Sequence, residues 1–234
     1  MATTESSSPQ TLTVPLFALD RCILLPGAST PLHIFEPRYR AMVDDLLEAV
    51  TDAPLAMGVY GRPAAPSLEP DQKPIRQAVC LGRIAQHQSL PGGRHQIIVE
   101  GIARAVVEGE ASPATGGYRR LHVRRHAMGR PMEIDLAEYR SAIRHRLAIE
   151  DLDGLAGIAR LRELAAGDLS TDALVDAATL LLLRGPDDAY HQLEEPDGRH
   201  RAQWLIDHLE ELIRAVRYAQ PFEGDAVQDG VGIN

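Results

Sequence analysis

The chain has 234 residues, of which 44% are hydrophobic, and this is enough to bury a core in one large or two small domains. Its formal net charge of −9 argues against general nucleic-acid binding, because phosphate contacts need clustered cations. No basic N-terminal region and no run of about 18 uncharged apolar residues occurs, so we expect a cytoplasmic protein that does not enter a membrane. Cys22 and Cys80 match no disulfide or metal spacing, and we expect both to be small buried residues.

The first half of the chain has the pattern of a β structure that follows a flexible tail. Residues 1–10 are rich in Ser and Thr and poor in apolar residues, which predicts a flexible end. Pro91, Gly92 and Gly93 predict a tight connection between two strands. Short alternating or β-branched runs, bounded by Gly and Pro, predict strands at 12–17, 31–35, 55–60, 78–87, 95–107 and 118–126.

One amphipathic helix interrupts these strands. Pro37 stands at a first helical position, and apolar residues then recur at helical spacing as far as Val50. The apolar stripe of this helix is expected to cover the β layer. Residues 61–76 contain four prolines and little periodicity, which predicts a surface loop.

The segment 119–130, RRLHVRRHAMGR, holds five arginines and two histidines. Because Leu121 and Val123 alternate with polar neighbours, we favour a half-buried strand with an arginine-rich outer face. The alternative interpretation is an anion site formed by Arg119, Arg120, Arg124 and Arg125.

From residue 131 the apolar spacing becomes helical. Helices are predicted near 136–147, 155–164 and 174–181, with a short helix after Pro186 and a last one that begins at the N-cap Asp197. Residues 219–234 carry Gly and acidic residues without a helical period and predict a second flexible tail. The fold class is therefore α+β. We expect a β domain over 11–128 and a helical domain over 131–218.

No catalytic motif is found. Lys73 is the one lysine in the chain, and it lies in the proline-rich segment without the GxxxxGK[ST] frame of a P-loop or the desolvation that a Ser-Lys dyad needs. His87 and His95 flank the predicted hairpin and could approach each other, but no HExxH motif is present, so surface histidines are favoured over metal ligands. We predict a protein that is not an enzyme and has no cofactor or metal. An unrecognised hydrolase is the weakest alternative.

Residues 14–40, VPLFALDRCILLPGASTPLHIFEPRYR, resemble the opening of the Lon protease N-terminal domain. The pattern is Pro-Leu-Phe-x-Leu, an apolar pair, Phe/Leu-Pro-Gly, a spacer, Pro-Leu-x-Ile-Phe-Glu and then Arg-Tyr. The resemblance continues more loosely to Arg104 and is weak beyond residue 130. The matching residues are Pro15, Leu16, Phe17, Leu19, Leu25, Pro26, Gly27, Pro31, Leu32, Ile34, Phe35, Glu36, Arg38 and Tyr39.

The resemblance implies a PUA-like pseudo-barrel with one packed helix, followed by a helical bundle. It implies a stand-alone relative of the Lon substrate-recognition domain, without ATPase or protease, that binds flexible or unfolded protein segments in protein quality control. The binding surface is expected to be a groove between barrel and helices, and neither its residues nor the oligomeric state follows from the sequence. The alternative is an RNA-binding PUA-like protein, which the overall acidity argues against.

The motif residues are expected to act mainly through packing, with direct ligand contact as the second interpretation. Pro26 and Gly27 predict a turn after an apolar strand. Phe35 and Tyr39 are expected to be core anchors. Glu36 stands at the positive end of the helix that begins at Pro37, and we expect Arg38 to pair with an acid or to cover the barrel.

Overall fold

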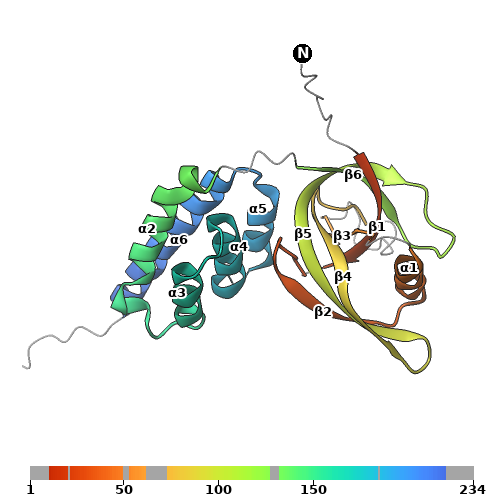
Figure 1. Ribbon diagram of the computed structural model, residues 1–234, viewed down its shortest axis with the longest axis horizontal. Helices are drawn as coiled ribbons and strands as arrows, with labels where there is room; N and C mark the ends of the chain where they lie inside the picture. Colours follow the sequence, from red (N-terminus) through yellow and green to blue (C-terminus); the bar gives the residue numbers. More distant parts are fainter. Residues whose placement is uncertain are drawn as a thin grey trace, which may run out of the picture.

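The computed structural model contains a β-barrel and a helical bundle that lie side by side (Figure 1). The α+β class, with strands first and helices after them, is confirmed. The predicted tails and most of the proline-rich segment 61–76 lie outside the described residues, and among the latter no helix is long and apolar enough to span a membrane. The structure describes residues 11–20, 22–49, 53–61, 73–126, 132–183 and 185–219.

The strands form a sheet that closes on itself. β1 pairs in parallel with β3, and antiparallel pairing then runs from β3 to β4, β5 and β6 and from β6 back to β1. β2 lies outside this ring and pairs with the first half of β5. Each predicted run overlaps one strand. The bounds are β1 Thr11–Leu19, β2 Ser29–Ile34, β3 Leu55–Val59, β4 Ala78–Leu90, β5 Arg94–Ala111 and β6 Arg120–Arg125.

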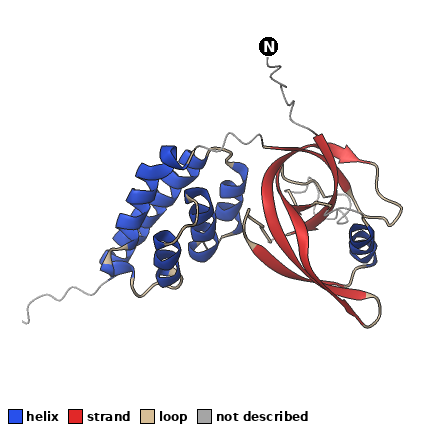
Figure 2. Ribbon diagram, viewed as in Figure 1, coloured by secondary structure: helices blue, strands red, loops and turns tan. Residues whose placement is uncertain are grey.

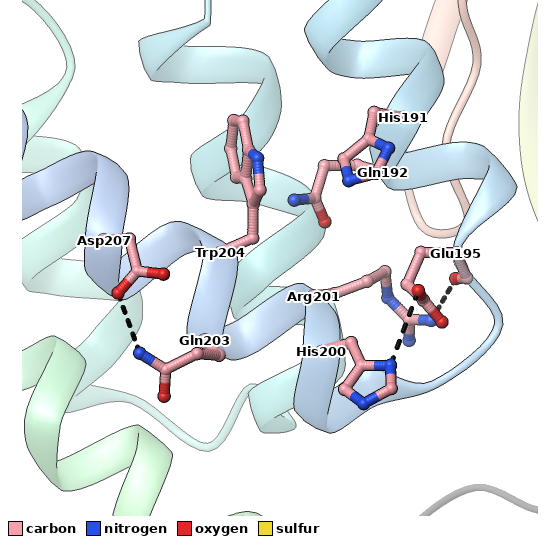
Figure 3. A pocket seen from close by; sticks show the side chains of 8 residues that line it. All are labelled: His191, Gln192, Glu195, His200, Arg201, Gln203, Trp204 and Asp207. Carbon is pink, nitrogen blue, oxygen red and sulfur yellow. Dashed lines mark hydrogen bonds and ion pairs between the residues drawn. The ribbon is translucent and has the colours of Figure 1, made fainter.

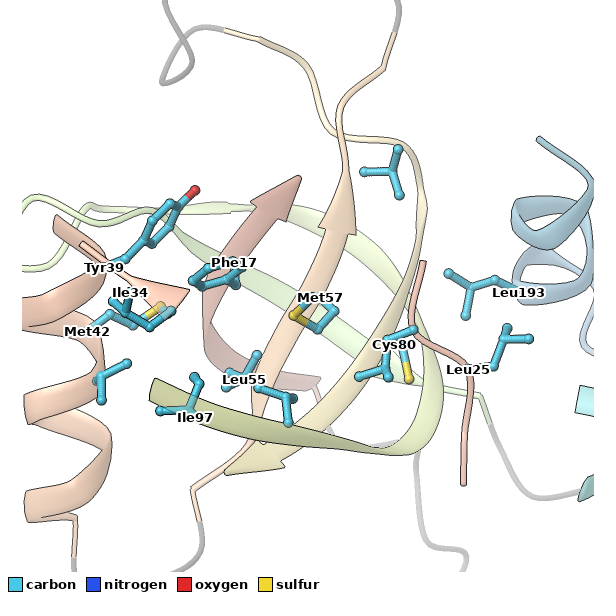
Figure 4. Packing of buried hydrophobic residues seen from close by; sticks show 14 of the residues in the cluster. Phe17, Leu25, Ile34, Tyr39, Met42, Leu55, Met57, Cys80, Ile97 and Leu193 are labelled. Atoms are coloured by element: carbon cyan, nitrogen blue, oxygen red, sulfur yellow. The ribbon is translucent and has the colours of Figure 1, made fainter. Parts of the chain in front are cut away.

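The helix α1, Pro37–Glu48, packs against the barrel and shares its core. Tyr39 stacks on Phe17 with ring centroids 4.3 Å apart, and its hydroxyl donates to the carbonyl of Ala18 at 3.3 Å (Figure 4). Burial raises the pKa of Tyr39. Met42 and Val43 on the same helix are fully buried. The expectation that Tyr39 anchors the core is confirmed.

The prediction that Phe35 is a core anchor is wrong, because 61% of this residue is exposed. Side chains alternate along a strand, and Ile34, at the end of β2, points into the barrel core with 1% exposed. The next side chain, Phe35, therefore turns outward, where its ring meets that of His33 edge-on at 6.1 Å.

The remaining motif residues have structural roles close to those expected. Pro26 and Gly27 form a turn in which Gly27 takes φ +78°, a conformation that favours glycine. Glu36 precedes the first turn of α1, and Arg38 donates to its carboxylate at 2.9 Å. Of the two cysteines, Cys80 is buried and Cys22 is half-buried, and both are free thiols.

The second half of the described chain is helical (Figure 2). Four of its helices, α2, α3, α4 and α6, share one apolar core. As predicted, Asp197 caps the last helix: its carboxylate accepts the backbone N–H of Arg199 at 2.9 Å, and the Arg199 side chain and this bond lower the pKa of Asp197 to about 2. The bounds are α2 Ala137–Leu147, α3 Ile158–Ala166, α4 Thr171–Leu182, α5 Pro186–Glu194 and α6 Gly198–Ala219, with short 3-10 helices at Glu133–Leu136 and Glu150–Leu152.

Helix α5 joins the bundle to the barrel. Tyr190 and Leu193 are buried in the barrel core, and Leu193 is labelled in Figure 4. The hydroxyl of Tyr190 accepts the backbone N–H of Ala78 at 2.8 Å. The guanidinium of Arg76 lies 3.3 Å from the centre of the Tyr190 ring and also pairs with Asp187. The division of the chain at residues 128 and 131 stays a prediction, since α5 contributes to the core of the β part.

Candidate functional site

A buried ionic network lies where the barrel meets the bundle. Arg104 of β5 donates to both carboxylate oxygens of Asp176 in α4, at 3.0 and 2.5 Å, and to the carbonyl of Gln192 in α5. The side chains of Arg104 and Asp176 are only 9% and 5% exposed. Burial raises the pKa of Asp176 more than the Arg104 charge lowers it.

Arg201, at the start of α6, extends this network. Its guanidinium donates to the carbonyls of Glu195 and Pro196 at 2.7 and 3.0 Å and to the carboxylate of Asp172 at 2.8 Å. Burial, and then the charge of Arg104, lower the pKa of Arg201. Two arginines are thus matched by two aspartates, and the network is neutral.

An open pocket of about 200 Å³ adjoins the network, between α5 and the first half of α6 (Figure 3). Two residues, Gln192 and Arg201, belong to both the pocket and the network. The lining residues are His191, Gln192, Glu195, His200, Arg201, Gln203, Trp204 and Asp207.

Trp204 gives this pocket an aromatic wall. It is the one tryptophan of the chain, and its side chain is half-buried. The His208 ring stacks on the indole with centroids 5.2 Å apart and planes 5° apart, and the His191 ring lies 6.3 Å away. Tryptophan is a frequent anchor at binding sites, because its side chain combines a large apolar area with a small number of rotamers.

Two polar atoms at the pocket lack partners among the described residues. Gln192 is 1% exposed and its Oε1 accepts no hydrogen bond, and Arg201 is 3% exposed and its Nε donates none. A buried polar atom without a partner costs about 1–3 kcal/mol. In Figure 3 the amide end of Gln192 points toward the side of the pocket that Trp204 forms. Both atoms have almost no exposed surface, so they are unsatisfied groups within the wall of the pocket and not contacts that a ligand can reach directly.

Two other hollows of the described chain are weaker candidates. A pocket of about 390 Å³ lies between α2 and α6, but Arg146 and Arg217, which line it, are paired with Glu210 and Asp151. A space of about 10 Å³ beside Tyr39 holds no more than one water.

The residues predicted from the motif do not line the α5–α6 pocket. They lie on β1, β2 and α1 or in the connections between these elements, and none of them is among the residues that line the pocket. Helices α1 and α5 are on opposite sides of the barrel (Figure 1). Trp204, Gln192 and Arg201 were missed by the sequence analysis. The only signal was a single tryptophan beside the apolar stripe of the last helix.

The predicted strand at the arginine-rich segment is confirmed, as β6, and its charges are largely paired. Arg119 pairs with Glu110 and Arg124 with Glu108, at 2.6 and 2.7 Å. Arg120 donates to the carbonyl of Ser112, whereas Arg125 is exposed. This pairing favours the structural interpretation over an anion site.

The two hairpin histidines do approach each other, with Nε2 of His87 and Nδ1 of His95 3.0 Å apart. Nε2 of His95 lies 3.3 Å from the carboxylate of Asp44 in α1, so the pair ties the hairpin to that helix. Within the described ranges, no three or more His, Cys, Asp or Glu residues are placed to hold a metal ion.

Comparisons with known proteins bear on this fold. Residues 13–211 match the family model described as the ATP-dependent protease La (LON) substrate-binding domain. The structure is similar to the N-terminal domain of a Lon protease of the Mycobacterium avium complex, with a TM-score of 0.59, 20% identity and coverage of 86% of this chain and 99% of that one. It is also similar to a Lon N-terminal domain protein from Xanthomonas campestris, with a TM-score of 0.54, 18% identity and coverage of 84% and 98%. No curated protein sequence gives a significant match.

Proposed function

Because the chain belongs to the family of Lon substrate-binding domains, we propose that it is a non-catalytic protein that binds flexible or unfolded protein segments. The family match carries this proposal, since it extends over residues 13–211 and so includes the barrel, α5 and every residue of the α5–α6 pocket. We propose a role in protein quality control in the cytoplasm.

The α5–α6 pocket suits a protein segment chemically. A polypeptide backbone carries an N–H donor and a C=O acceptor at nearly every residue, and these complement the exposed polar side chains that line the pocket, such as Gln203 and Asp207. The Trp204 ring offers an apolar surface for a side chain of the same segment. In a native protein most such backbone groups are already paired, so an unfolded segment is the better ligand.

We expect the purified protein neither to hydrolyse ATP nor to cleave casein. The Lys73 side chain is 27% exposed, and its ammonium group lies 4.0 Å from the largely exposed carboxylate of Asp20, so it is not the desolvated base that a Ser-Lys dyad needs. Activity is measured by phosphate release and by peptide release. Casein cleavage that needs ATP and is lost in Lys73→Ala would contradict this expectation.

Binding to an unfolded model protein should change the fluorescence of Trp204. With a reduced, tryptophan-free model protein as the ligand, all tryptophan emission comes from this pocket. We expect a micromolar dissociation constant, about −8 kcal/mol, because ordering a flexible ligand offsets part of the contact energy. The native form of the same model protein should bind more weakly.

The variant Trp204→Ala should lose about 2 kcal/mol of binding free energy, roughly thirtyfold in affinity, as measured by calorimetry. Tyr218→Ala is the matched control, because Tyr218 is another aromatic residue of α6 but is 95% exposed and lies outside the pocket. If the protein binds the native and the unfolded ligand with equal affinity, the proposed preference for unfolded segments is refuted. If the Trp204→Ala variant binds the unfolded ligand as tightly as the unmodified protein does, the α5–α6 pocket is not the binding site.

A further inference from the structure

We infer that the α5–α6 pocket selects basic protein segments, with a Lys or Arg side chain lying against Trp204 near the carboxylates of Glu195 and Asp207. This inference rests on the proposed function, and it adds the chemical class of segment that the same pocket accepts.

The charge that the pocket presents to a ligand is negative. With histidines counted as neutral, its ionised lining residues are Glu195, Asp207 and Arg201. Arg201 is 3% exposed and is neutralised by Asp172 and two backbone carbonyls, so its charge is directed into the protein. Asp207 is exposed and accepts a hydrogen bond from the neutral amide of Gln203 at 2.8 Å. The Glu195 carboxylate accepts the backbone N–H of Asp197 and lies 3.5 Å from the His200 ring.

The aromatic wall lies between these carboxylates. In Figure 3 Glu195 and Asp207 are on either side of Trp204 along the pocket. An ammonium or guanidinium group within about 6 Å of an indole face gains about 0.5–1 kcal/mol at an exposed site. A cation at Trp204 would therefore meet both the ring and the field of the two acids.

The same two carboxylates discriminate against the opposite class of segment. An acidic side chain at Trp204 would be repelled by Glu195 and Asp207, which both line the pocket. A lysine or arginine side chain brings several hydrogen-bond donors and no acceptor, so it can pair with either carboxylate.

The net charge of the whole chain acts in the same direction. A formal charge of −9 attracts cationic segments over a distance and raises their association rate at low ionic strength. The pocket then discriminates among them at short range.

The test uses short tryptophan-free peptides that differ only in whether two positions are Lys, Gln or Glu. Binding to the full chain is followed by Trp204 fluorescence and calorimetry. We expect the Lys peptide to bind about tenfold more tightly than the Gln peptide and the Glu peptide to bind least, from a cation–π contact and two partly exposed ion pairs. Glu195→Gln and Asp207→Asn should each lower the affinity for the Lys peptide about threefold without changing that for the Gln peptide.

Glu211→Gln is the control, since it removes the same charge from an exposed position of α6 outside the pocket. If Glu211→Gln lowers the affinity for the Lys peptide as much as Asp207→Asn does, net charge alone explains the preference for the Lys peptide and the inference fails. Equal binding of the three peptides, by a protein that still binds the unfolded model protein through Trp204, overturns the inference but leaves the proposed function standing. Binding of neither the peptides nor the unfolded protein overturns both.

Discussion

Replacing Arg104 with methionine is expected to lower the free energy of unfolding by about 3–5 kcal/mol at pH 7. The guanidinium of Arg104 joins β5 to α4 and α5, and its removal leaves the carboxylate of Asp176, 5% exposed, without its bidentate partner. A buried charge that loses its counter-charge keeps its desolvation cost and loses the attraction that offset it. Urea unfolding measures the change.

The same variant should recover stability as the pH falls from 7 toward 4. Burial already raises the pKa of Asp176 from the ordinary 3.8, and loss of the Arg104 charge raises it further. When the pKa is higher in the folded state, that state binds the proton more tightly, so the penalty is full above the folded pKa and is relieved as pH falls through it.

A double variant, Arg104→Met with Asp176→Leu, serves as the control. Because it removes both charges, it should regain much of the stability that Arg104→Met loses. If instead the loss in Arg104→Met does not depend on pH and adds to that of Asp176→Leu, the two side chains do not form a coupled buried pair.

Tyr39 and Phe35, two of the three aromatic residues of the motif, should respond very differently to truncation. Tyr39→Ala should cost about 3–5 kcal/mol, because the buried ring stacks on Phe17 and its loss leaves a cavity. Phe35→Ala should change the free energy of unfolding by about 0.5 kcal/mol or less, because 61% of Phe35 is exposed. Thermal or urea unfolding of both variants measures the contrast.

Tyr39→Phe separates packing from hydrogen bonding at the same position. It keeps the stacked ring and removes the bond to the Ala18 carbonyl, so the expected cost is about 1 kcal/mol. A loss in Phe35→Ala as large as that in Tyr39→Ala would show that the Phe35 ring is buried in solution.

The order of the elements could be predicted from the sequence because strands and helices leave local periodic signals. Alternation located β6 at Leu121 and Val123, and the proline at position 37 and the aspartate at position 197 marked the starts of α1 and α6. The motif at residues 14–40 was read correctly as a family signature, which the match over residues 13–211 confirms. Its residues record packing and turns, so they gave the fold but not the pocket.

Local patterns could not settle the direction of one side chain at a strand end. Phe35 follows Ile34 at the boundary between β2 and the turn into α1, and an apolar pair there leaves open which of the two enters the core. The pairing of Ile34 with His95 in β5 decides it, because the register fixes which face each residue takes.

The sequence by itself therefore determined the elements, their order and the family, because each depends on residues that are neighbours along the chain. Only the tertiary structure decided the junction and the candidate site. Arg104 and Asp176 are 72 positions apart, and the pocket exists only because α5 and α6 pack together beside the buried ionic network. Ion pairs and binding surfaces between distant segments leave no periodic signal in a single sequence. The desolvation cost and the electrostatic attraction of a buried ion pair arise only when folding removes both partners from water.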